Sequence, residues 1–294
     1  MAHRLALVTV AATFVLILFG GLVTNTGAAL AVTDWPTTFG YTMFFYPWSQ
    51  MVGGIFYEHS HRLLGSLVGL LTIALAVALW RKGGRLRALG LVMVVAVVTQ
   101  GVLGGLRVVL LKETLAIVHG CLAQAFFALA VVAALLTSVS HRLPVQGFDP
   151  ALRRLTVAAA ALVYVQIVLG ALLTHAGRIV PHLIGAAAVF VFVPMVTGRL
   201  RRTRDAIAAP VGSVLVLLLG LQLLLGAGSF VSRFMSVWIP GGQLTMLVLP
   251  VTHRLVASLI LAAAVVAAVR ALGAGHVAPT RVVRTQPSLR LVRG

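Results

Sequence analysis

Four histidines stand at matched positions in four separate apolar segments of this 294-residue sequence. They are His61, His119, His182 and His253. In each segment, roughly 17 to 23 residues separate the histidine from the first arginine at the expected cytoplasmic end, which corresponds to about 25 to 35 Å of helix. Because the four depths agree, we expect all four imidazoles near the same, outer side of a membrane.

Two imidazoles that face each other across a helical bundle are natural axial ligands for haem iron. Zinc would need further Cys, His or carboxylate ligands, and the chain has 1 Cys and 5 acidic residues. A lone histidine in a membrane helix often only donates a hydrogen bond, worth about 0.6 kcal/mol, but four at one depth are harder to explain in this way. Each is followed four positions later by a small residue, on the helix face where a flat macrocycle could lie. These residues are Gly65, Ala123, Ala186 and Ala257. The pattern predicts two bis-histidine haem sites.

Glu58 stands three residues before His61, on the same helix face and at the outer edge of the membrane. An acid is costly there, which favours a function. One interpretation is an ion pair with Arg62 or Arg107. The other is a proton donor or acceptor, or a group that organises water, beside a reactive iron centre. The three residues directly before His182 are Ile179, Val180 and Pro181, so the second half has no equivalent of Glu58 and any chemistry is expected in the first half.

Arg62, Arg107 and Arg254 lie near the outer ends of apolar segments. Arginine in that position can pair with haem propionates, or it can simply extend its charge to the interface. Both interpretations stay open. His59 and His175 are assigned to a loop or to the interface, and neither is an equal candidate for a ligand.

The elements that position these residues are expected to be membrane helices. Hydrophobic residues make up 60% of the chain and charged residues 10%, which is too little polar surface for a soluble protein. Eight apolar runs have the length that a bilayer requires. They cover roughly residues 5–31, 58–80, 88–111, 114–138, 155–174, 181–198, 210–231 and 244–271. Alternating strand patterns are absent, so the sequence predicts an all-α membrane protein with eight transmembrane helices.

The net charge of +18 does not indicate a nucleic-acid partner. Most Lys and Arg residues fall on one side of the predicted spans, as the positive-inside rule describes. We therefore expect an integral protein of a prokaryotic plasma membrane with both termini in the cytoplasm. The basic segment 273–294 is interpreted as a cytoplasmic tail on the membrane surface.

An internal repeat divides the spans into two halves. The segment Gly20-Gly-Leu-Val-Thr-Asn-Thr-Gly27 reappears as Gly170-Ala-Leu-Leu-Thr-His-Ala-Gly177, and Gln100-Gly-Val-Leu-Gly104 reappears as Gln222-Leu-Leu-Leu-Gly226. Four spans per half predict two tandem four-helix bundles related by a pseudo-twofold axis along the membrane normal. The expected units are 1–140, a linker 141–154, 155–272 and the tail. The first half has a longer outer loop, rich in aromatics, which is interpreted as an interface belt or as a lid over the first site.

The chain resembles the haem A synthase family. The resemblance rests on the Gly20 segment, Asp34-Trp35-Pro36, Glu58-His-Ser-His61-Arg62, Gln100-Gly-Val-Leu-Gly-Gly105 and the later histidines. It implies oxidation of the C8 methyl of haem O to the formyl of haem A by successive hydroxylations, for haem-copper oxidases. It also implies that His61 and His119 ligate the substrate haem beside Glu58, and that His182 and His253 ligate a resident haem b. Expected partners are haem O synthase, an external electron donor, membrane lipid and another copy of the chain.

The chain departs from the family pattern at one point, and two alternative functions stay open. Some family members carry a cysteine pair in the first outer loop, but here Ala31, Val32 and Thr33 precede Asp34 and the only cysteine is Cys121. A step that depends on loop thiols is therefore excluded. The alternative functions are a di-haem b-type electron carrier and a haem-handling transporter without catalysis. The electron donor, the source of oxygen, the oligomeric state and the occupancy of each haem site do not follow from the sequence.

Overall fold

The computed structural model describes residues 1–235 and 240–274, and this part of the chain is almost entirely helical. Its long helices are α1 (Ala2–Asn25), α2 (Gly53–Trp80), α3 (Gly84–Leu110), α4 (Glu113–Thr137), α5 (Pro150–Ala176), α6 (Ile179–Leu200), α7 (Ala208–Phe234) and α8 (Gly242–Gly273). Each of these eight described helices is long and apolar enough to cross a membrane. This confirms the predicted class, an all-α integral membrane protein.

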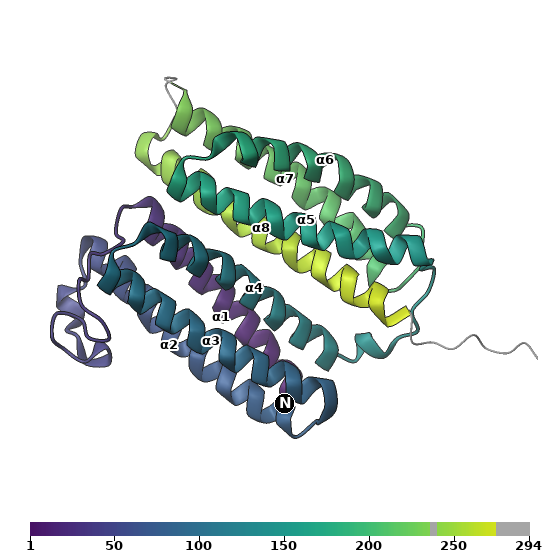
Figure 1. The fold of residues 1–294 in the computed structure, drawn as a ribbon, viewed down its shortest axis with the longest axis horizontal. Coiled ribbons are helices and arrows are strands. Elements are labelled where there is room, and N and C mark those ends of the chain that lie inside the picture. Colours follow the sequence, from purple (N-terminus) through teal and green to yellow (C-terminus); the bar gives the residue numbers. More distant parts are fainter. Residues whose placement is uncertain (236–239, 275–294) are drawn as a thin grey trace, which may run out of the picture.

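The helices form two groups of four (Figure 1). In the first group, α1 contacts α2, α2 contacts α3, α3 contacts α4, and α4 returns to α1, so the group closes into a ring. Helices α5 to α8 close in the same way. The two rings meet through α4 against α8, α4 against α5, and α1 against α8. A twofold axis would produce this set of contacts, and the twofold relation itself stays a prediction.

Small and branched side chains fill the two rings and the seam between them. Ala130 and Ala133 of α4 are fully buried in the first ring, and Ala264 and Ala267 of α8 are nearly so in the second. At the seam, Phe127 packs in a cluster with partly buried side chains of α8. Large apolar side chains on the outside remain exposed, for example Leu217 at 74%. Such a surface requires lipid around it.

The ends of several helices differ from the predicted spans. Helix α1 ends at Asn25 rather than at residue 31, and the side chains of Thr24 and Asn25 in its last turn donate to the carbonyls of Gly20 and Gly21. Gly27 follows with φ of +69° and turns the chain into the outer loop. Helix α2 begins at Gly53, five residues before the predicted span. Residues 275–294 of the predicted basic tail lie outside the described residues.

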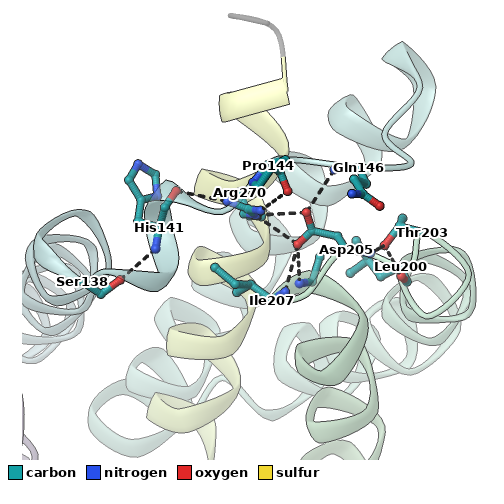
Figure 2. A network of polar contacts seen from close by, with 10 residues as sticks. Ser138, His141, Pro144, Gln146, Leu200, Thr203, Asp205, Ile207 and Arg270 are labelled. Atoms are coloured by element: carbon teal, nitrogen blue, oxygen red, sulfur yellow. Dashed lines mark hydrogen bonds and ion pairs between the residues drawn. The ribbon is translucent and has the colours of Figure 1, made fainter.

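At the end of the bundle opposite the outer loop, a buried ion pair joins segments that are distant in sequence (Figure 2). Arg270 of α8 donates from Nε to both carboxylate oxygens of Asp205, at 3.0 and 3.1 Å, and both side chains are 0% exposed. Arg270 also donates to the carbonyls of His141 and Pro144 in the α4–α5 linker. The pair thus ties the linker, the α6–α7 loop and α8 together.

Candidate functional site

The four histidines come together as two pairs, one inside each ring of helices. The rings of His61 (α2) and His119 (α4) have centroids 6.4 Å apart, inclined at 75°. Those of His182 (α6) and His253 (α8) are also 6.4 Å apart, inclined at 69°. In both cases the partners come from opposite helices of the ring. Nothing within the described ranges groups three or more His, Cys, Asp or Glu side chains around a metal position, so a metal would be held by a histidine pair.

A glycine on the neighbouring odd-numbered helix supports each histidine ring. A Cβ built on Gly20, Gly104, Gly170 or Gly226 would lie 3.2, 3.4, 3.4 or 3.0 Å from Cε1 of His61, His119, His182 or His253, respectively. A larger residue would push the imidazole out of its place. The sequence interpretation used these glycines only to define the repeat. The sequence did contain a signal for their role, since all four glycines lie in the repeated segments.

The donor set fits an iron porphyrin. If a metal ion lay between the two rings, its two bonds to imidazole nitrogens, each about 2 Å long, would span about 4 Å. The rest of the 6.4 Å between the ring centroids corresponds to the distance from each bonded nitrogen to the centroid of its own ring. Nδ1 of His61, of His119 and of His253 is buried without a hydrogen-bond partner, which is uncommon for polar groups in a packed interior. A Cβ built on Gly65, one turn after His61, would meet no atom within 4 Å. The space beside Gly65 is therefore open, on the helix face that His61 shares.

The two pairs differ in their polar neighbours. In the second ring, Nε2 of Gln166 lies 3.2 Å from Nδ1 of His182, and Nε2 of Gln222 lies 3.2 Å from Nε2 of His253. In the first ring Gln100, the repeat equivalent of Gln222, has a buried Nε2 without a partner. Side-chain amides therefore contact the second pair and not the first, which makes the two sites chemically unequal.

The residues around His61 hold the outer loop. Glu58 is 5% exposed. Its Oε1 accepts from Nη2 of Arg62 at 3.0 Å and its Oε2 accepts from the backbone N–H of Val32 at 3.0 Å. His59 was predicted to lie in a loop or at the interface. It does not lie in a loop: it is 1% exposed in α2 and pairs with the hydroxyl of Thr38 at 3.1 Å.

The three arginines that were candidate propionate partners have distinct surroundings. Besides Glu58, Arg62 donates to the carbonyls of Val32, Asp34 and Thr37. Arg107 lies 3.9 Å from Glu113, which also pairs with His175 at 3.0 Å and so links α4 to the end of α5. Arg254 of α8 extends to Gly21 of α1, at the seam between the rings. Of the two ion pairs considered for Glu58, the structure has the one with Arg62.

Asp34 stabilises the turn that places Trp35. Its carboxylate accepts from the Thr37 hydroxyl and from the backbone N–H groups of Phe39 and Gly40. Burial raises the pKa of Asp34, but these hydrogen bonds outweigh it and lower the pKa to about 2, from 3.8. The turn therefore gains stability from the ionised carboxylate above the unfolded-state pKa, and loses it as the pH falls toward 2.

Asp34→Ala should loosen the outer loop at neutral pH, because three donors lose their acceptor. We expect limited proteolysis of this loop to be about tenfold faster, in proportion to the population of the open loop. The matched control is Asp149→Ala, which removes a carboxylate that caps α5 at the other end of the bundle. Equal cleavage rates in the two variants would contradict the role of Asp34.

Comparisons with known proteins agree with this geometry. Residues 3–285 match the family described as cytochrome oxidase assembly protein, COX15-CtaA. A protein named heme A synthase from Shouchella clausii is 34% identical over 110 residues, which are 36% of this chain and 35% of that protein. One of the same name from Alkalihalophilus pseudofirmus is 32% identical over 108 residues, 35% of each chain. These alignments span about a third of the curated relatives' length.

The family match extends through all eight described helices and both histidine pairs. The chain belongs to the cytochrome oxidase assembly protein family.

Proposed function

We propose that this protein is a haem A synthase, which oxidises the C8 methyl of haem O to a formyl group. The observation that carries the proposal is the presence of two histidine pairs with the same 6.4 Å separation, one in each ring of helices. Relatives that bear the name heme A synthase support it. A bound haem iron supplies the redox chemistry. The protein's own residues hold, orient and shield it.

We assign the substrate haem to His61 and His119, and a resident haem b to His182 and His253. His61 of the first pair lies on the same helix as Glu58 and Arg62, which anchor the outer loop. Glu58 is the acid nearest to His61 in sequence, three residues before it, and we propose it as the group that accepts or donates a proton there. The amides of Gln166 and Gln222 suit a permanently held cofactor, because they restrict the imidazoles of the second pair.

The arginines, the orientation and the partners complete the proposal. Arg107 and Arg254 would pair with propionates, whereas the donors of Arg62 are directed to the loop and to Glu58. Both termini would be cytoplasmic, which places the histidines toward the outer leaflet. The enzyme would receive haem O from haem O synthase and electrons from an external donor, and it would function in lipid, alone or with another copy of the chain.

Glu58→Gln is expected to abolish the conversion of haem O while both haem sites stay occupied. The test is expression of the full chain beside a haem O synthase in a host that lacks haem A, followed by extraction and mass analysis of the haems. The wild-type protein should yield haem A. If it holds bis-histidine haem b and makes none, the protein is an electron carrier and the proposal fails.

Arg62→Gln separates the two roles of Glu58. This variant removes donors from three loop carbonyls but keeps the carboxylate. If Glu58 acts only through the loop, Arg62→Gln should impair conversion at least as strongly as Glu58→Gln. If the carboxylate moves a proton, Glu58→Gln should be the slower variant by about a hundredfold.

A further inference from the structure

A cavity of about 450 Å³ lies between the outer loop and the outer end of α3. Leu30, Asp34 and Trp35 line it from the loop, and Val108, Val109 and Leu111 line it from α3 and the residue after it. Its lining is mainly hydrocarbon. The polar lining residues are Thr33 and Asp34, and the carboxylate oxygens of Asp34 accept hydrogen bonds from the loop's own turn. The cavity therefore suits an apolar ligand.

The cavity adjoins the first histidine pair. Gly104 supports the ring of His119, and the next residue, Gly105, is covered by the indole of Trp35, which a Cβ on Gly105 would overlap. Val108 lies one turn beyond Gly104 on the same face of α3, a rise of about 6 Å, and it is 7% exposed. A ligand held by His61 and His119 could therefore extend one turn along α3 and enter the cavity.

The outer edge of the cavity faces the region that lipid occupies. Val109 is 60% exposed and Leu111 is 67% exposed at the end of a membrane-spanning helix. An amphipathic molecule dissolved in the membrane could thus reach the first pair without crossing water. Trp35, which is 43% exposed, forms the wall on the loop side.

The second half of the protein has a larger side chain at the equivalent position. By the repeat that aligns Gln100–Gly104 with Gln222–Gly226, Gly105 corresponds to Ala227 and Val108 corresponds to Phe230. The ring of Phe230 packs against Phe234 at 5.4 Å between centroids. An aromatic side chain thus stands where the first half has the smaller Val108, so the two sites differ in the shape of the ligand that they can accept.

We propose that this cavity binds the long hydrocarbon substituent of a porphyrin whose iron is held by His61 and His119. The cavity then selects haem O, which carries such a substituent, over haem b, which does not. This inference rests on the proposed function and adds a subsite for the substrate. Trp35 and Gly105 set the width of the subsite, and Val108 and Val109 line its apolar wall.

The test compares binding of the two haems to variants that fill the cavity. Val108→Phe introduces the residue type that the second half has at the equivalent position. Val109→Trp fills the cavity from its exposed edge, where the larger side chain should disturb the buried packing little. The matched control is Val231→Trp, at the equivalent position of α7. The full chain is purified in detergent from cells that make haem b but no haem O, and is titrated with each haem while the Soret absorbance is followed.

Both cavity variants should lose affinity for haem O by about tenfold or more, which is the usual effect of occluding an apolar pocket. Their affinity for haem b should stay at the wild-type value, and Val231→Trp should bind both haems as the wild type does. Equal weakening of both haems, or no weakening of haem O, would overturn the inference. If His61→Ala leaves haem O binding unchanged, the proposed substrate site itself fails, which is a different result.

Discussion

His119→Ala is expected to purify with about half the haem of the wild-type protein and to make no haem A. The two pairs lie in separate rings of helices, so loss of one axial ligand should empty one site and leave the other intact. Removal of a partner that only orients a ligand costs about 10- to 100-fold in metal affinity, so removal of the ligand itself should cost more. His253→Ala should empty the other site. Haem per polypeptide and the bis-histidine spectrum of each variant measure this directly.

His175→Ala is the matched control for these variants. His175 also lies near the outer end of the bundle, but it pairs with Glu113 and with no other histidine. Its replacement should leave the haem content unchanged. A His119→Ala protein that retains full haem content with an unaltered spectrum would show that the first pair is only a hydrogen-bonding feature of the helices.

The helices and the histidine pairs followed from sequence because both depend on local periodicity. A span of apolar residues must be a helix in a bilayer, and histidines at one depth in one ring come close together when both face its interior. Gly20 and Gly170, identified as a repeat, turned out to support His61 and His182. Their role could not be read from composition, because glycine is also common in membrane helices for other reasons.

The contacts of the outer loop and the buried Arg270–Asp205 network could not be predicted from the sequence. Both depend on contacts between residues that are distant in the chain. Arg62 and Glu58 were considered as a pair, but the bonds from Arg62 to three loop carbonyls have no sequence signature. His59 was assigned to a loop or the interface, but its side chain is buried, where an unpaired polar group is costly. The hydroxyl of Thr38, 21 residues earlier, removes that cost.

Arg270→Met should destabilise the protein more than any exposed arginine variant at the same end of the bundle. Asp205 would remain fully buried with backbone donors but without its counter-ion. Leaving one partner of a buried ion pair alone costs about 3–5 kcal/mol. The Tm in detergent should fall on the order of 10 °C. Arg202→Met, at an exposed position after α6, is the control and should change the Tm little.

The same pair predicts how stability depends on pH. Burial raises the pKa of Asp205, but the hydrogen bonds from Arg270 and from three backbone N–H groups outweigh it, so its pKa lies below the ordinary 3.8. The stabilisation is therefore complete above the unfolded-state pKa and is lost as the pH falls through the folded one. Wild-type and Arg270→Met should thus differ most in Tm at neutral pH and converge under strongly acidic conditions.

A double variant decides between an ion pair and simple packing. In Asp205→Leu with Arg270→Met, no buried charge is left without a partner, so the Tm should lie above that of either single variant. If the two losses simply add, the side chains act independently and the charge pairing contributes nothing. If the coupling is present, the linker after α4, the α6–α7 loop and α8 are joined through one electrostatic contact. Such a contact would keep the two rings, and with them the two histidine pairs, in one arrangement.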